Sequence, residues 1–321
     1  MADARAPSPI KPISGGSLRE AELPGVTGVA WPTPAARSES PFAQGVRRLR
    51  RSTTALVGVA IVSVLLIVAA FADVLAPQSP IASDQTQTFA SPSWDHPLGT
   101  DQLGRDMLSR VIHGSRISLL VGVSSVLLAL FVGVPLGMMA GYYGGRIDSV
   151  VMRTMDLILA FPIYLLAIIL MVIFTPTAGL IGTMKVTGAI AIVRIPIYAR
   201  LVRGSVLSIK EKEYVEACRA LGVRDPWILF RHVLPNCLAP IIVTTTLGIA
   251  TAIIVEATLS FLGLGTQPPT PSWGWDLKAN VAFIQANLWL SLFPGLAIFV
   301  TVLGFNLFGD GLRDALDPRL K

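Results

Sequence analysis

Long apolar runs separated by polar segments dominate the chain from about residue 55 onward. Six of them approach or exceed the roughly 20 residues that an α-helix needs to cross a bilayer. They cover residues 55–76, 117–141, 154–174, 179–199, 237–258 and 288–309. The third run contains Pro162, which predicts a kink. The pattern predicts an all-α membrane protein with six transmembrane helices.

Composition agrees with this class. Of the 321 residues, 52% are hydrophobic and only 14% are charged, and the mean hydropathy is +0.63. Basic residues account for the net charge of +6, but they cluster beside apolar runs and do not interleave with aromatic residues, which argues against a nucleic-acid surface. Neither Cys218 nor Cys237 has a His or Cys at metal-ligand spacing. We therefore expect no metal site, no structural disulfide and no catalytic residues.

The distribution of Lys and Arg predicts the orientation. Arginines cluster at 47–51 before the first run, and more basic residues lie at 200–236 and at the C-terminus. We expect these three regions, and so both termini, in the cytoplasm. Ala70-Phe71-Ala72 raises the alternative of a cleaved signal peptide. The apolar run and the region before it are too long for one, so we expect a retained helix.

The chain divides into segments by composition. Residues 1–45 are rich in Pro, Ser, Gly and Ala, which predicts a disordered cytoplasmic tail. The segments that follow are an N-terminal helix with an external segment at 46–116, a helical core at 117–311 that contains a cytoplasmic loop at 205–236, and a cytoplasmic tail at 312–321.

The polar loop between the fourth and fifth runs contains two short predicted helices. Ser208-Ile209-Lys210-Glu211 fits a capping box, which predicts a helix start near Ile209. Residues at helical spacing form its mostly apolar face: Tyr214, Ala217, Cys218 and Leu221. The opposite side is charged, with Glu213, Glu216 and Arg219.

A hinge and a second helix follow. Gly222 predicts a left-handed end to the first helix. Asp225-Pro226 predicts the start of the second, and Pro235 is expected to limit its length.

This loop resembles the EAA loop of permease subunits of ATP-binding cassette importers. In that family a Glu-Ala-Ala is followed by a spaced Gly and an Ile-x-Leu-Pro; here Glu216-Ala217-Cys218, Gly222 and Leu234-Pro235 match, while His232 replaces the Ile. The resemblance implies that the loop's short helix sits in a groove of an ATPase subunit and transmits its closure. The residues expected to take part are Glu213, Glu216, Ala217, Arg219, Gly222, Asp225, Leu234 and Pro235.

Three further motifs resemble the second permease subunit of dipeptide, oligopeptide and nickel importers. They are the segment 96–106 (HPLGTDQLGRD), residues 152–156 with Ala160-Phe161-Pro162, and residues 260–265 followed by Gln267-Pro268-Pro269. The likeness spans about residues 45–321. It implies one N-terminal helix followed by a five-helix core, which pairs with a homologous permease around a central path.

The same resemblance implies the rest of the assembly. Two cytoplasmic ATPase subunits would hold ATP and magnesium, and an external solute-binding protein would deliver substrate to this subunit in the bacterial or archaeal cell membrane. The chain has no Gly-x-x-x-x-Gly-Lys-Ser/Thr loop, so we expect neither a cofactor nor ATP hydrolysis in it. The expected cargo is a di- or oligopeptide or a related solute; glutathione and nickel stay open.

Ionisable residues within apolar runs are costly and are therefore functional candidates. Glu256 is expected to face the path or the partner subunit. Arg194 either lines the path or pairs with a neighbouring helix, and Asp156, close to Arg153, is expected to pack or form an ion pair. A stripe with a period of four predicts close helix packing: Gly133, Gly137 and Gly141.

Two other functional classes make different demands on the sequence. A secondary transporter driven by an ion gradient would favour paired intramembrane carboxylates and inverted halves. A membrane enzyme would need a nucleophile, a metal cluster or an acid/base pair at the membrane face. Neither pattern stands out in this chain.

Overall fold

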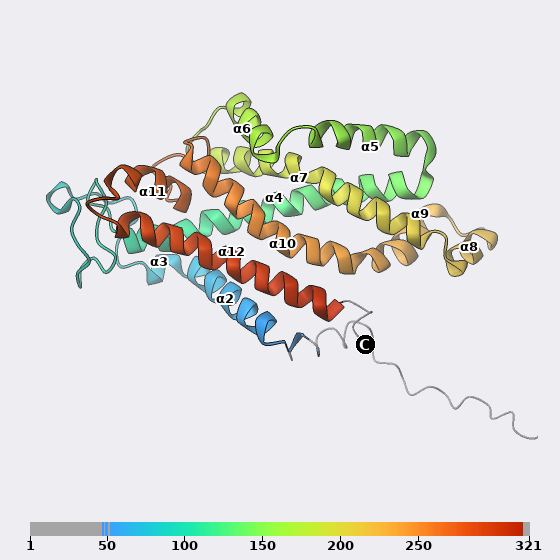
Figure 1. Cartoon of the computed structure of the whole chain (residues 1–321), viewed down its shortest axis with the longest axis horizontal. Helices are drawn as coiled ribbons and strands as arrows, with labels where there is room; N and C mark the ends of the chain where they lie inside the picture. The colour runs from blue at the N-terminus through green and yellow to red at the C-terminus, as the bar shows by residue number, and fades with distance from the viewer. Residues whose placement is uncertain (1–46, 48, 51, 317–321) are drawn as a thin grey trace, which may run out of the picture. The chain divides into compact units, whose positions relative to one another are not determined.

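The computed structural model describes residues 47, 49–50 and 52–316, so the predicted tail at 1–45 lies outside the described residues. Within this part all regular secondary structure is helical (Figure 1). The α-helices are α2 (Thr53–Ala70), α3 (Ala72–Leu75), α4 (Met107–Tyr143), α5 (Gly145–Leu159), α6 (Ile163–Phe174), α7 (Gly179–Ile209), α8 (Glu213–Ala220), α9 (Asp225–Ile228), α10 (Leu234–Phe261), α11 (Trp273–Asn280) and α12 (Trp289–Leu316). Short 3-10 turns cover Gln85–Gln87 and Val281–Phe283, and a π-helical turn, η2, covers Leu229–Val233.

Five helical segments of the described chain are long and apolar enough to cross a membrane: α2, α4, α7, the continuous stretch Asp225–Phe261, and α12. Each coincides with a predicted run, but the structure extends most of them. For example, α4 begins at Met107, because Asp106 caps it by accepting a hydrogen bond from the Ser109 amide at 2.8 Å. At the C-terminus, α12 runs to Leu316 and so into the predicted tail, whose last residues, 317–321, are not described.

The third predicted span is a bent pair of helices. The axes of α5 and α6 meet at 89°, so the two can form a sixth span only as a broken one. Pro162 lies at the break with an extended ψ of 134°. Because proline disfavours helical geometry in the residue before it and lacks an amide hydrogen, the chain turns sharply here where the sequence predicts a kink.

The predicted glycine stripe lies where α4 packs against α7 of the same chain. A Cβ atom on Gly133 would lie 2.8 Å from the Ile195 carbonyl oxygen, and one on Gly141 would lie 2.8 Å from Val206 Cβ. Between them, a Cβ on Gly137 would collide with the Ala199 carbonyl. The two backbones therefore approach to a separation that only glycine permits.

The N-terminal membrane helix packs against the last one. Gly58 of α2 faces the backbone of Phe308, and Gly311 of α12 faces Ala55. Helix α12 also packs on α10, where Gly309 meets Leu247. The first helix is thus attached to the core through α12, and also through Arg116 of α4, whose Nε donates to the Ala69 carbonyl at 2.6 Å.

The end of the long helices that carries α11 also carries residues 77–106, opposite the end with α8 and α9 (Figure 1). Here His96 Nδ1 lies 3.0 Å from Asp106 Oδ1, and Arg110 Nε donates to Asp276 Oδ1 at 2.8 Å. The side chains of Arg110 and Asp276 are both about 1% exposed. Burial raises the pKa of Asp276, and the Arg110 guanidinium opposes that rise. This buried pair joins α4 to α11.

The glycine contact makes a direct prediction about stability. Gly137→Ala places a methyl group against Ala199 and Val202, so we expect the free energy of unfolding to fall by about 1–3 kcal/mol. Gly188→Ala on α7 is the matched control, because a Cβ there meets no heavy atom within 4 Å. Thermal unfolding of the purified protein in detergent, followed by tryptophan fluorescence, measures both. Equal stability of the two variants would show that the α4–α7 approach does not depend on glycine.

Candidate docking surface and buried membrane sites

The loop after α7 begins later than its sequence suggests. Helix α7 continues to Ile209, so Ser208 lies inside its last turn, and α8 starts at Glu213 with Lys212 at its N-cap. The predicted capping box and helix start near Ile209 are therefore wrong. The reason is packing: Val206 and Ile209 are buried in one apolar cluster with Val202, which keeps this segment helical.

Helix α8 rests on a residue outside the predicted apolar face. Val215 is fully buried and Cys218 is half-buried beside it. The other members of the predicted face are exposed: Leu221 is 83% exposed, and Tyr214 is 41% exposed although its Oη accepts a hydrogen bond from Asn236 Nδ2 at 3.4 Å. The apolar face is real, but the structure presents most of it outward.

The hinge after α8 has the predicted geometry. Gly222 has a φ of +75°, in the left-handed region, and no atom lies within 4 Å of the position of a Cβ. The Val223 amide donates to the Cys218 carbonyl at 3.0 Å and the Gly222 amide donates to the Arg219 carbonyl at 2.9 Å, which closes α8. The conformation, rather than crowding, therefore requires glycine here.

The second helix does not stop at Pro235. Helix α9 begins at Asp225, passes into the π-helical turn η2 and continues as α10. Pro235 lies in the first turn of α10, where a missing amide hydrogen is tolerated. The expectation that it limits this helix is wrong, because the π-helical turn changes the hydrogen-bond register just before it.

The segment 213–230 exposes large apolar and acidic side chains at the α8 end. Trp227 is 61% exposed and Phe230 is 66% exposed. Glu213 and Glu216 are also exposed, and their carboxylates make no hydrogen bond or ion pair within the described residues. We name this set the docking surface: Glu213, Tyr214, Glu216, Leu221, Trp227 and Phe230. Exposed apolar groups of this size indicate an interaction site.

Arg219 and Asp225, which the sequence assigns to the same loop, both contact the end of α4. They hydrogen-bond to Tyr142 at the end of α4, with Arg219 Nε donating to Tyr142 Oη at 3.3 Å. Tyr142 was not anticipated as a site residue. In the sequence Tyr142 directly follows the glycine stripe. That position is the signal that could have placed it in the turn of α4 nearest the loop.

Two ion pairs attach α5 to α7. Arg203 contacts both carboxylate oxygens of Asp148, at 2.5 and 2.6 Å, and Arg200 lies 2.5 Å from Asp156. Asp156 thus forms an ion pair, with a partner on α7 rather than the neighbouring Arg153. These pairs hold the first half of the broken span.

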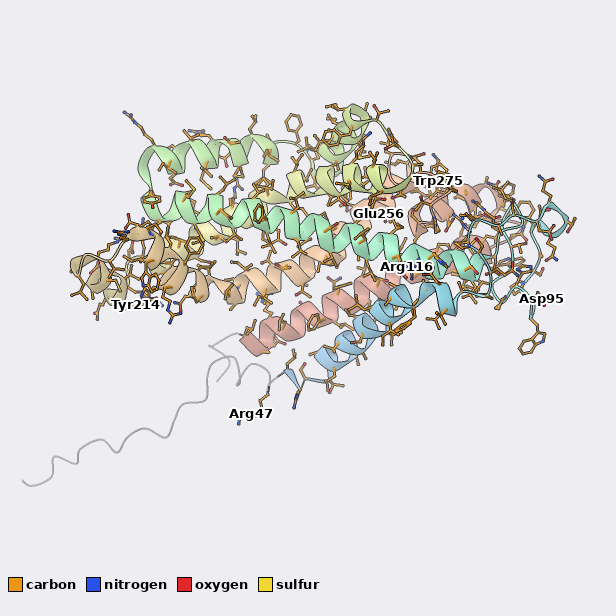
Figure 2. The ribbon with its side chains drawn as sticks, turned by 180° about the vertical axis from the view of Figure 1, so that it is seen from behind. Arg47, Asp95, Arg116, Tyr214, Glu256 and Trp275 are labelled. Atoms are coloured by element: carbon orange, nitrogen blue, oxygen red, sulfur yellow. The ribbon has the colours of Figure 1, made fainter. Side chains whose placement is uncertain are left out.

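Glu256 is enclosed within the chain. It belongs to α10 and is fully buried, and it accepts hydrogen bonds from Ser118 Oγ of α4 at 3.1 Å and from Ser260 Oγ at 2.8 Å. Figure 2 shows it between Tyr214, at the α8 end, and Trp275 and Asp95, at the other end. The expectation that it faces a path or a partner does not hold in this structure, since both carboxylate oxygens already have partners.

Arg194 fastens α7 to α10. Its Nη2 donates to the Gly248 carbonyl at 2.7 Å and to Thr251 Oγ1 at 2.6 Å, and the side chain is 9% exposed. A Cβ on Gly248 would lie 3.0 Å from this guanidinium nitrogen. Of the two roles that the sequence leaves open, the structure shows the contact with a neighbouring helix.

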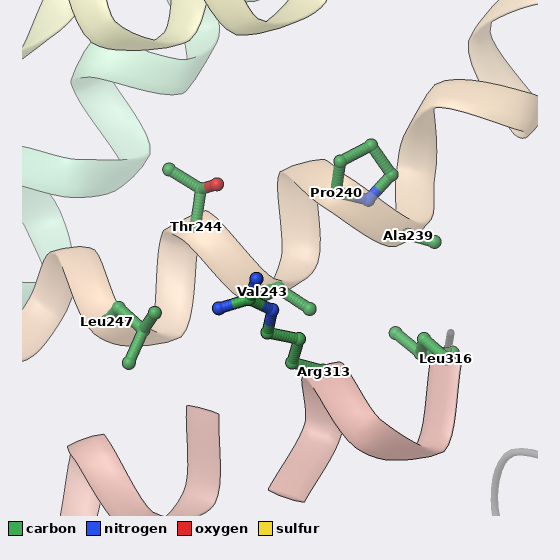
Figure 3. A pocket seen from close by; sticks show the side chains of 7 residues that line it. All are labelled: Ala239, Pro240, Val243, Thr244, Leu247, Arg313 and Leu316. Atoms are coloured by element: carbon green, nitrogen blue, oxygen red, sulfur yellow. The ribbon is translucent and has the colours of Figure 1, made fainter. Parts of the chain in front are cut away.

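Two of the cavities along the described helices lie beside α10. One, of about 390 Å³, is between α10 and the end of α12, and Arg313 is the charged residue among those that line it (Figure 3). The other, of about 920 Å³, is an apolar groove between α4 and the start of α10, with Phe131 and Phe230 in its walls. We assign no ligand to either.

Comparisons with known proteins agree with this arrangement. Residues 133–321 match the family described as "binding-protein-dependent transport system inner membrane component", and residues 40–92 match "N-terminal TM domain of oligopeptide transport permease C". The chain is 45% identical over 282 residues to the dipeptide transport system permease protein DppC of Alkalihalophilus pseudofirmus, covering 88% of this chain and 91% of that protein. It is 44% identical to the glutathione transport system permease protein GsiD of Pectobacterium atrosepticum, covering 88% and 92%.

A solved structure shares the fold. A chain of the inward-facing methionine ABC transporter MetNI superposes with a TM-score of 0.54 at 18% identity, covering 66% of this chain and 98% of that one. The matched family extends over more than half of the sequence, including α7, the docking surface and α10. This protein therefore belongs to the family of inner-membrane components of binding-protein-dependent transport systems.

Proposed function

We propose that this permease subunit forms, with a homologous permease, the translocation path for di- or oligopeptides delivered by an external binding protein. The observation that carries the proposal is the docking surface, which projects from the α8 end on a hinge that requires glycine. An exposed apolar surface with unpaired carboxylates suits a soluble protein partner. We assign that partner as an ATPase subunit, one of two that hold ATP and magnesium and hydrolyse ATP outside this chain.

The peptide cargo rests on relatives of similar length. Their names specify dipeptide, di/tripeptide and glutathione transport, and glutathione is itself a tripeptide. The shared chemistry is a short chain with amide groups and a free carboxylate. In this subunit the buried charges Glu256 and Arg194 are occupied by contacts within the chain, so we place cargo selection mainly in the binding protein.

The function is tested by assembly and uptake. Expressed alone, this chain should show no ATPase activity. Expressed with the permease, ATPase and binding-protein genes that we expect beside its own, it should copurify with those subunits and support ATP-dependent peptide uptake in proteoliposomes. Mass spectrometry of the ligand on the purified binding protein identifies the cargo. Robust uptake by this chain alone, in vesicles without ATP, would favour a secondary transporter instead.

The orientation follows from the positive charges beside the spans, and we propose that both termini and the docking surface are cytoplasmic. Single cysteines, placed in a background without Cys218 and Cys237, would be labelled with an impermeant thiol reagent on intact cells. Residues 85–110 and 265–285 should label from outside, and residues 205–230 should label only after the cells are opened. Labelling of the 205–230 loop in intact cells would contradict this orientation.

The docking surface should couple ATP hydrolysis to transport. Gly222→Val forces a β-branched residue into a left-handed conformation, at a cost of about 1 kcal/mol or more, and so displaces α9 relative to α8. Glu216→Lys reverses an unpaired charge at the contact. We expect both variants to insert normally and to lose most uptake and most ATPase stimulation by the loaded binding protein.

Two controls isolate this effect. Asp310→Lys places a reversed charge on an exposed position of α12, away from the docking surface, and removal of residues 2–40 shortens the chain almost entirely before the matched region, which begins at residue 40. Both should transport at close to the wild-type rate. If each of the single variants Gly222→Val and Glu216→Lys supported uptake at the wild-type rate, the loop would take no part in coupling.

A further inference from the structure

One tyrosine hydroxyl joins three helices at the α8 end. Tyr142, in the last turn of α4, is 7% exposed. Its Oη donates to Asp225 Oδ1 at 2.7 Å and accepts from Arg219 Nε at 3.3 Å. The directions are unambiguous, because a carboxylate only accepts and a guanidinium only donates. The guanidinium carbon of Arg219 also lies 4.7 Å from the centre of the Tyr142 ring, within cation–π range.

These contacts fall on both sides of the hinge. Arg219 is in the last turn of α8 and Asp225 is the first residue of α9, with Gly222 between them. No direct ion pair joins Arg219 to Asp225 in the part of the chain that the structure describes, so the Tyr142 hydroxyl is the bridge. Since no atom packs where a Gly222 side chain would lie, this bridge constrains the angle between α8 and α9.

The surrounding packing ties the same turn of α4 to the loop. Val215 of α8 and Ile228 of α9 are fully buried and belong to one apolar cluster with Tyr142. Lys210 Nζ, just after α7, donates to the Gly141 carbonyl at 2.9 Å. That carbonyl is in the last turn of α4, where helix carbonyls lack an intrahelical partner. The end of α4 thus contacts Lys210, α8 and α9.

We infer that Tyr142 is a positioning residue that sets the geometry of α8 and α9 and links both to α4. The inference rests on the proposed function, because the movement that Tyr142 transmits to α4 is the closure of the ATPase subunits. Helix α4 is continuous over 37 residues, about 55 Å at 1.5 Å per residue, and its other end carries the Arg110–Asp276 pair. A displacement of the docking surface therefore reaches the opposite end of the molecule through one helix.

The first test measures the loop itself. Tyr142→Phe keeps the ring and removes the bridging hydroxyl. Tyr143→Phe is the matched control, because its ring lies against Tyr142 with centroids 5.2 Å apart and its hydroxyl has no hydrogen bond within the described residues. In the purified complex, hydrogen–deuterium exchange of residues 213–228 should be several-fold faster in Tyr142→Phe and unchanged in Tyr143→Phe.

The second test measures coupling. Asp225→Asn retains an oxygen that accepts from Tyr142, whereas Asp225→Ala does not. We expect Tyr142→Phe and Asp225→Ala each to lower the ratio of binding-protein-stimulated to basal ATP hydrolysis several-fold, and Asp225→Asn to restore most of it. The double variant Tyr142→Phe/Asp225→Ala should be no worse than either single variant, because both remove the same hydrogen bond.

The outcomes separate this inference from the proposed function. Unchanged exchange in Tyr142→Phe would refute the bridge. Faster exchange with a normal stimulation ratio would show that Tyr142 orders α8 and α9 and would refute its role in coupling. A wild-type complex that shows neither uptake nor stimulation would refute the proposed function, while the exchange measurement would still decide whether Tyr142 orders α8 and α9.

Discussion

The close approach of α4 and α7 is the contact on which the rest of the structure depends. In a bilayer the hydrophobic effect does not drive helices together, so association relies on close packing and on polar contacts between helices. Gly133, Gly137 and Gly141 allow the backbone of α4 to touch that of α7 over two turns. The C-terminal ends of the two helices are therefore side by side, and the loop that follows α7 folds onto the last turn of α4. The docking surface has its position because of this crossing.

Polar residues within the spans reinforce the same arrangement. Glu256 is held by a serine from α4 and one from its own helix, and Arg194 binds the backbone of α10 where Gly248 leaves room for it. A polar group that found no partner there would be costly. Both carboxylate oxygens of Glu256 and Nη2 of Arg194 have partners within the chain, and these contacts fix how α4, α7 and α10 are rotated relative to one another. They therefore act here as structural contacts.

The loop shows how packing decides which face of an amphipathic helix is buried. Tyr214, Ala217, Cys218 and Leu221 share a face, and Val215 lies beside it. An amphipathic pattern normally implies that the apolar side is buried in the same chain. In α8 the anchor is Val215, because the segment after α7 is held by Lys210 and by the cluster beneath it, and this sets the rotation of the helix. Most of the wider apolar face is left exposed.

The sequence by itself determined the elements that depend on local chemistry. Apolar runs placed the membrane helices, a glycine predicted the left-handed stop at 222, and a proline located the break near 162, since each follows from hydropathy or from backbone geometry. The loop motifs also indicated the family. The sequence could not decide the 89° bend between α5 and α6, the continuation of the second loop helix through Pro235, or the partners of Glu256, Arg194 and Tyr142. The packing of the whole chain decides these features. Ser118 and Glu256, for example, are 138 positions apart in the sequence, and only the packing of the helices brings them within hydrogen-bond distance.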